Sequence, residues 1–301
     1  MPIVFAAPLT GPAGGLGANP RFMSWTGFDG TVWPLSDPMG RPAMQRGVKG
    51  LHMPRFNVYE SSTPLVPGVE LTGYDLPART VYWPLMFQAN SITQWEALHA
   101  GFFNSIHPID PGVWTVGEGT AQRTLPLTGV FDGSYSFDTD PFIRGHALIG
   151  VELLAPRPLW RGRPITKTFR AQEGVPFIPV DLAPSFNISP AASFTTANIS
   201  NPGDEPSYLV WTINGPMPEV ELGVSGAIIE VPFALDEGDT LVIDTDPAGQ
   251  YATLNGVDCT RELGFQAFAP VPPRGTSPLA IAATGDGSVS VSLTPLYWRA
   301  Y

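Results

Sequence analysis

The tetrapeptide Asp-Thr-Asp-Pro, which occurs twice, is the stretch whose residue types could do chemistry, because paired carboxylates can hold a divalent cation. The copies stand at 138–141 and 244–247. A calcium-binding EF-hand loop needs further oxygen ligands and a glutamate at its twelfth position. Counted from the first aspartate of each copy, that position holds Ile149 and Asn255. Aspartate before proline is ordinary turn chemistry, so both copies are interpreted as strand terminators and no metal site is predicted.

No other local motif indicates catalysis. The four histidines lack the spacing of metal ligands, and no Gly-x-Ser-x-Gly elbow is present. The glycine cluster at 11–20 has no strand and helix around it to frame a dinucleotide site, so residues 1–24 are predicted to be a Gly/Pro-rich arm. The single Cys259 excludes an internal disulfide and is interpreted as a small buried residue. A catalytic Ser-His-Asp triad, or a pair of catalytic carboxylates, that only the folded chain brings together is an alternative that the sequence leaves open. The sequence nevertheless favours a protein that is not an enzyme and uses no cofactor.

Aromatic side chains are the ambiguous feature of the C-terminal half. On the face of a β-sandwich, rings next to carboxylates and amides could stack on a sugar. They could instead fill the core or a subunit contact, and this second interpretation is the stronger one. The candidate residues for a carbohydrate or partner contact are Tyr208, Trp211, Tyr251 and Trp298.

Composition indicates a β-rich protein with weakly charged surfaces. Of 301 residues only 14% are charged, while 34 are proline and 32 are glycine, which is typical of short strands joined by tight turns. Residues 1–170 hold 13 basic and 12 acidic side chains, but 171–301 hold 3 and 15. Such an acidic balance argues against nucleic-acid binding. The N-terminal residues show no basic leader and no long apolar run, so we expect a soluble protein without membrane insertion.

Periodicity predicts one helix, at 91–106, in an otherwise β N-terminal half. Its apolar residues recur at steps of three and four, and Ser91 followed by Gln94 forms a capping box. Strands are expected before and after it, at 79–89 and 112–116. The apolar residues of the helix face are Trp95, Leu98, Phe102 and Ile106.

The C-terminal half reads as a β-sandwich or jelly roll. Short apolar strands recur about every ten residues between turns rich in Asn, Gly, Asp and Pro. Together with the change in charge, this pattern predicts a β domain at 25–165 and an acidic sandwich domain at 166–301, joined through the linker Leu-Leu-Ala-Pro-Arg-Pro-Leu-Trp-Arg-Gly-Arg at 153–163. The expected strands are 207–213, 220–224, 226–233, 239–245, 250–255, 278–283 and 289–293.

The order of these segments resembles the distal tail proteins of siphophages, the Dit-like family. The resemblance lies in NISNPGDEPSYLVWTING at 198–215, GDTLVIDT and LNG within 220–256, and the aromatic end VSVSLTPLYWRAY at 289–301. It implies a mainly β fold with an N-terminal β-barrel-like domain carrying one helix and a C-terminal jelly-roll or galectin-like sandwich.

The resemblance also implies a function. Such proteins form a homohexameric ring at the distal end of the virion's tail, where tail tube, tape-measure and receptor-binding proteins meet. They are made in the host cytoplasm and have no catalytic residues. A carbohydrate-binding adhesin that recognises host wall polysaccharide is the alternative hypothesis, and a glycoside hydrolase is the third.

Overall fold

A computed structural model describes most of the chain. The residues described are 22–37, 41–131, 133, 136–137, 143, 145–170 and 197–301. The first Asp-Thr-Asp-Pro segment, at 138–141, and residues 1–21 of the predicted arm lie outside them.

The chain forms two compact units. Unit 1 comprises Met1–Pro158 and Arg299–Tyr301, and unit 2 comprises Leu159–Trp298. The predicted domains at 25–165 and 166–301 imply one passage of the chain between them, whereas the chain passes between the two units twice. The reason is that the end of the chain bonds within unit 1, where the Arg299 carbonyl accepts from Arg123 and the Ala300 N–H donates to the Leu51 carbonyl.

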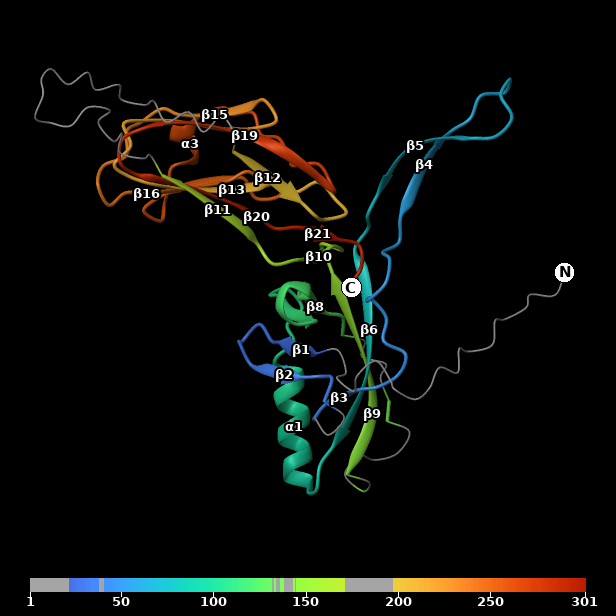
Figure 1. The fold of residues 1–301 in the computed structure, drawn as a ribbon. Coiled ribbons are helices and arrows are strands. Elements are labelled where there is room, and N and C mark those ends of the chain that lie inside the picture. Colours follow the sequence, from blue (N-terminus) through green and yellow to red (C-terminus); the bar gives the residue numbers. More distant parts are fainter. Residues whose placement is uncertain are drawn as a thin grey trace, which may run out of the picture. The chain divides into compact units, whose positions relative to one another are not determined.

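Unit 1 contains a curled, half-barrel sheet, a helix and a separate hairpin (Figure 1). The sheet has the strand order β2-β1-β7-β8-β9-β6-β3, with antiparallel neighbours. Its curl agrees with the predicted β-barrel-like domain. The elements are β1 (Met23–Thr26), β2 (Val32–Pro34), β3 (Ala43–Met44), β4 (Asn57–Ser61), β5 (Glu70–Asp75), β6 (Arg79–Gln88), α1 (Ile92–Asn104), β7 (Gly112–Val116), a 3-10 turn (Gly119–Ala121), β8 (Arg123–Gly129) and β9 (His146–Ala155).

Tryptophans fill the core of unit 1. The rings of Trp25 and Trp114 meet that of Trp83 edge to face, with centroids 5.4 and 5.2 Å away, and all three side chains are fully buried. Edge-to-face rings add to the stabilisation from burial itself. Because residues of β6 alternate between core and surface, the strand presents Trp83 inward.

The predicted helix is confirmed as α1. Ser91 caps it, since its Oγ accepts a hydrogen bond from the Gln94 N–H at 3.2 Å. The side chain of Gln94 in turn accepts one from the Asn90 N–H at 3.3 Å, one residue before the N-cap N–H that a capping box uses. The helix ends at Asn104, two residues before the predicted end, because Ser105 turns its N–H and its Oγ onto the Phe102 carbonyl.

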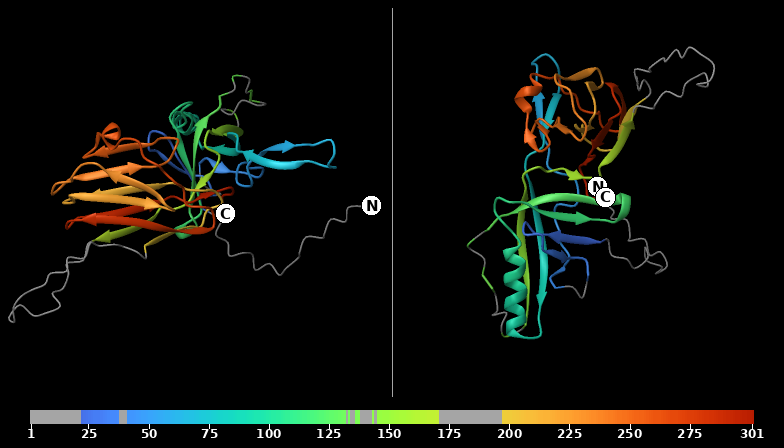
Figure 2. Two further views of the ribbon diagram at one scale, coloured as in Figure 1. Left: turned by 90° about the horizontal axis from the view of Figure 1, so that it is seen from above. Right: turned by 90° about the vertical axis from the view of Figure 1, so that its left-hand side faces the viewer.

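Unit 2 is a sandwich of two antiparallel sheets (Figures 1 and 2). One sheet has the order β11-β20-β13-β16-β17-β18 and the other β12-β19-β14-β15. The elements are β10 (Trp160–Arg161), β11 (Ile165–Arg170), β12 (Asn198–Asn201), β13 (Leu209–Asn214), β14 (Glu219–Val224), β15 (Ala227–Val231), β16 (Thr240–Asp244), β17 (Tyr251–Leu254), β18 (Val257–Asp258), α3 (Thr260–Leu263), β19 (Gly275–Thr284), β20 (Ser288–Leu293) and β21 (Leu296–Tyr297).

Alternation of apolar and polar residues builds the sandwich core. Strand β13 buries Leu209, Trp211 and Ile213 and turns the residues between them outward. These side chains form one apolar cluster with Leu222 and Ile281 of the other sheet, so the two sheets share a core. The predicted C-terminal β-sandwich is therefore confirmed. No α-helix in the described part of the chain has the length and hydropathy of a membrane span.

Candidate functional site

The second Asp-Thr-Asp-Pro segment is a turn, as predicted. The Asp246 N–H donates to Oδ1 of Asp244 at 2.9 Å, and the Ala248 N–H donates to Oδ1 of Asp246 at 3.0 Å. Both carboxylates thus cap the backbone two residues further on, which is the Asx-turn geometry. Across the residues that the structure describes, no three His, Cys, Asp or Glu side chains gather as a metal site would require.

The four predicted contact aromatics have different environments. Trp211 has 1% of its surface exposed and belongs to the core, so its assignment as a contact residue is corrected. The physical reason is that Trp211 occupies one of the alternate positions of β13 whose side chains point into the core. Tyr208 and Trp298 are half-buried, while Tyr251 on β17 is 44% exposed. The indole N–H of Trp298 donates to Oε1 of Glu205 at 2.8 Å, so this ring has a structural bond within unit 2.

A cavity of about 720 Å³ in unit 1 is the space where chemistry would be sought. Its wall is mostly aromatic and aliphatic, and includes Phe103, Phe131 and the titratable His99 and Glu152. His99 stacks on Trp95 with ring centroids 4.8 Å apart, and burial lowers the pKa of its imidazole. Among the described lining residues no nucleophile is hydrogen-bonded to a base, which a covalent mechanism requires.

A bare hairpin is the most unusual surface of unit 1. Strands β4 and β5 pair only with each other, and the hairpin projects from the other strands of the unit (Figure 1). Every residue of β5 is exposed, and Leu65 in the connecting loop is 91% exposed. An isolated two-stranded hairpin is at best marginally stable in water, so this one has the character of a binding element.

The hairpin is two-faced. Val58 is paired with Tyr74 and Glu60 with Leu71, and paired residues share a face. Val58, Tyr74 and Leu71 are 48%, 50% and 66% exposed, so the face, which also carries the Glu60 carboxylate, is largely apolar and open to solvent. We call the face formed by Val58, Leu71 and Tyr74 the arm face. A contiguous apolar surface of this kind marks an interaction site.

The sequence contains a local signal for this hairpin. The segment 57–75 reads as two alternating runs on either side of a loop rich in Pro, Thr and Gly, a hairpin signature. What neighbouring residues cannot show is that neither strand would join the main sheet.

A buried arginine closes the root of the hairpin. The guanidinium of Arg79 follows β5 and donates through Nη1 to the carbonyls of Gly50, at 2.7 Å, and His52, at 3.0 Å, which precede β4. Burial lowers the pKa of Arg79 to about 10, so the side chain stays charged at neutral pH. The backbone of Gly50 has a φ of 108°, and a Cβ there would lie 2.7 Å from Val81 Cγ2. Only glycine fits this position without strain.

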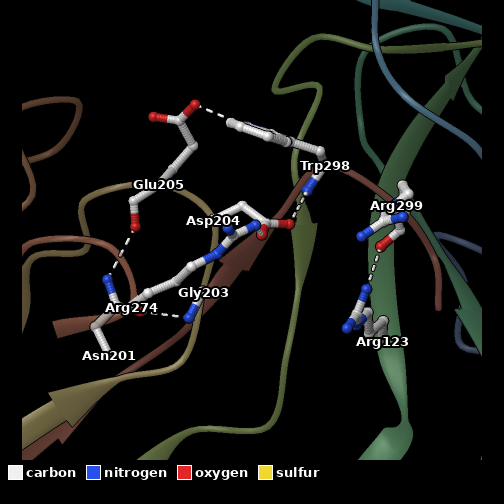
Figure 3. A network of polar contacts seen from close by, with 8 residues as sticks. All are labelled: Arg123, Asn201, Gly203, Asp204, Glu205, Arg274, Trp298 and Arg299. Carbon is white, nitrogen blue, oxygen red and sulfur yellow. Dashed lines mark hydrogen bonds and ion pairs between the residues drawn. The ribbon is translucent and has the colours of Figure 1, made fainter.

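In unit 2, the segment that opens the sequence resemblance forms a polar network (Figure 3). Asn201 is 1% exposed; its Nδ2 donates to the carbonyls of Glu205, at 2.9 Å, and Val271, at 3.1 Å. Its Oδ1 accepts the Gly203 N–H at 2.8 Å. A buried amide with three hydrogen bonds is well satisfied. The Asn-x-Gly-Asp motif is therefore a structural element of the sandwich.

Comparison with known proteins gives matches by structure alone. No protein-family model and no curated protein matches the sequence. The structure is similar to that of the SPP1 Dit protein (gp 19.1), described as a paradigm of the hub adsorption apparatus in phages infecting Gram-positive bacteria. The TM-score is 0.62 and the identity 14%, over 92% of this chain and 98% of that one.

Two structures of the phage p2 baseplate are also similar. For the activated conformation with calcium, the TM-score is 0.53 and the identity 11%, over 91% of this chain and 97% of the other. For the conformation with strontium, the TM-score is 0.53 and the identity 12%, with the same coverage of 91% and 97%. At such identities the likeness establishes the fold. The chain has the fold of the phage distal tail protein Dit, as the motifs between Asn198 and Tyr301 predicted.

Proposed function

We propose that this protein is a structural component of a long non-contractile phage tail, where it forms the ring that joins the tail tube to the tail tip. In this role it anchors host-recognition proteins and contacts the tube and tape-measure proteins. The observation that carries the proposal is the Dit fold, which extends over 92% of the chain and therefore over both units. Fold alone does not determine function, so further support for this role has to come from the surface of the chain.

The arm face supports self-assembly. Its apolar side chains are exposed, so no other described part of the same chain covers them. A projecting arm that docks on a different surface of the next copy makes a heterologous contact, and repeated heterologous contacts close into a ring when the rotation allows. A ring of identical copies is thus the assembly that this surface fits.

A structural role also agrees with the side-chain chemistry. In the described ranges, the carboxylates of the second Asp-Thr-Asp-Pro segment cap a turn, and the large cavity is lined mainly by rings and aliphatic groups. Neither arrangement positions a reacting group.

The proposal is tested in virions and in solution. An antibody against unit 2 should label only the distal end of intact tails in electron micrographs, and the purified protein should scatter light as an oligomer. Labelling along the whole tail, or a monomer that persists when tube and tip proteins are added, would refute the proposal.

A second candidate function, carbohydrate binding by unit 2, is favoured by one surface. The outward face of the larger sheet carries hydroxyl pairs, such as Thr168 with Ser290 at 2.8 Å and Thr166 with Ser292 at 3.3 Å. Tyr251, 44% exposed, stands on the same sheet. Neutral hydroxyls and an exposed ring suit a polysaccharide. Replacing Tyr251 with alanine should abolish retention on host wall polysaccharide; equal retention of the variant, or none by the native chain, removes this candidate.

A further inference from the structure

Unit 1 separates its positive and negative charges into two consecutive stretches of chain. Residues 41–55 contain basic side chains and no Asp or Glu, and we call this stretch the basic segment. Residues 57–75, which form the β4–β5 hairpin, contain acidic side chains and no Lys or Arg, and we call this stretch the acidic hairpin. All of these charged side chains are exposed. The cations are Arg41, Arg46, Lys49 and Arg55, and the carboxylates are Glu60, Glu70 and Asp75.

The two stretches do not neutralise one another within a copy. Among the described residues, no ion pair joins a carboxylate of the acidic hairpin to a cation of the basic segment. Lys49 lies over the ring of Tyr82, with its Nζ 5.8 Å from the centroid, and so faces its own sheet. Each copy therefore presents to its surroundings one acidic and one basic surface.

The basic segment runs along the edge of the half-barrel sheet. It contains β3, which ends the strand order and pairs with β6. Beyond β3, the Gln45 N–H donates to the Pro84 carbonyl at 2.8 Å, and Lys49 exchanges two backbone hydrogen bonds with Tyr82. Charged side chains at a sheet edge discourage a further strand from pairing there. A partner would therefore contact the side chains of this segment and not extend the ladder.

Each surface also has an apolar part. In the basic segment, Met53 is 41% exposed between Lys49 and Arg55. In the acidic hairpin, the arm face is largely apolar and carries Glu60 on the same side. Methionine adapts its shape to the surface that it meets. The two surfaces can thus combine an apolar contact with charges of opposite sign, and the roughly 20 residues of the hairpin approach the size of one side of a standard interface.

The signs of the charges decide which surfaces can meet. Two acidic hairpins repel one another, and so do two basic segments, whereas a hairpin and a segment attract. A contact between different surfaces of identical copies is heterologous, and it repeats from copy to copy. The charge pattern therefore favours the kind of contact that closes a ring and disfavours a two-fold pairing of hairpin on hairpin.

We propose that the acidic hairpin of one copy docks on the basic segment of the next copy. This inference rests on the proposed function, because it names the surface that receives the arm face during self-assembly. The apolar side chains supply the area of the contact, and the charges determine its direction and exclude the wrong pairing.

Exchanging the charges of the two surfaces in the full-length chain tests the docking. The hairpin variant is Glu60→Lys together with Glu70→Lys, and the segment variant is Arg46→Glu together with Arg55→Glu. The matched control for the hairpin variant is Glu96→Lys with Glu118→Lys, which makes the same change of charge at exposed positions of unit 1 outside both stretches. Light scattering over a dilution series measures self-association, and circular dichroism checks that each variant is folded.

We expect each test variant alone to dissociate at a concentration at least about tenfold higher than the native chain, because attraction becomes repulsion at two positions. The control should associate like the native chain. An equimolar mixture of the two test variants should also associate like the native chain. In the mixture, the reversed hairpin of one variant meets the reversed segment of the other, and their two unchanged surfaces match as well. Misfolded variants could not regain association in this way.

Two results would overturn the docking while leaving the ring in place. Test variants that associate like the native chain show that these charges lie outside the contact, even if the segment variant loses binding to the tube protein. A mixture that associates as weakly as its components shows that the two surfaces do not meet. A native chain that stays monomeric with tube and tip proteins present would instead overturn both this inference and the proposed function.

Discussion

Removing the apolar side chains of the arm face should weaken self-assembly. Val58→Thr together with Leu71→Thr places β-branched residues, which favour strands, at both positions and replaces aliphatic surface with hydroxyls. Fully burying a valine or leucine contributes about 1.5–3 kcal/mol. These two are 48% and 66% exposed, so roughly half of each side chain is available to a neighbour. The loss is then about 1 kcal/mol per residue and about 2 kcal/mol per contact.

A loss of this size raises the dissociation constant of one contact about thirtyfold. Light scattering over a dilution series measures the concentration at which the native chain and the variant dissociate. The matched control is Asn57→Thr together with Ser61→Thr, which alters the opposite face of the same hairpin. Circular dichroism should show no change in either variant, because these side chains contribute nothing to a core. If the arm-face variant dissociates at the same concentration as the control, the hairpin is not the contact, and the reasoning from its bare surface is wrong.

Three further predictions concern stability. Trp211→Ala should destabilise unit 2 by about 3–5 kcal/mol, because it empties a fully buried site; a urea midpoint near that of the native chain would contradict the core assignment. Gly50→Ala should cost about 1–3 kcal/mol, since φ is 108° and the added Cβ meets Val81; melting temperature measures this, and no change would show that the loop can adjust. The lowered pKa of His99 means that the unfolded chain binds a proton more readily than the folded one. Stability is therefore complete above the ordinary pKa of histidine, about 6.5, and declines as the pH falls below it. Urea unfolding at several pH values should show a smaller decline in His99→Phe, and equal declines would rule His99 out as the cause.

The sequence predicts those elements whose information is local. The helix at 92–104 was identified because its apolar side chains recur every three or four residues and Ser91 caps it. The sandwich strands were identified because burial alternates along each one, as in β13. The second Asp-Thr-Asp-Pro turn was identified for the same reason, since Asp244 and Asp246 bond backbone only two residues away.

What the sequence did not predict depends on partners far along the chain. Ala300 bonds Leu51, and Arg123 bonds Arg299, across separations that no periodic pattern encodes. Trp211 was kept as a candidate contact residue beside the core interpretation, because the sequence does not say which alternate side chains of β13 face inward. Likewise, Val58 and Leu71 look like ordinary strand residues until it is known that their hairpin stands apart from the sheet.

Electron microscopy of the purified full-length protein tests the central claim most directly. The account predicts closed rings of identical copies with a central opening, which disappear when Val58 and Leu71 are both replaced by threonine. Single particles no larger than one chain, at tens of micromolar protein and in the presence of tube and tip proteins, would contradict it.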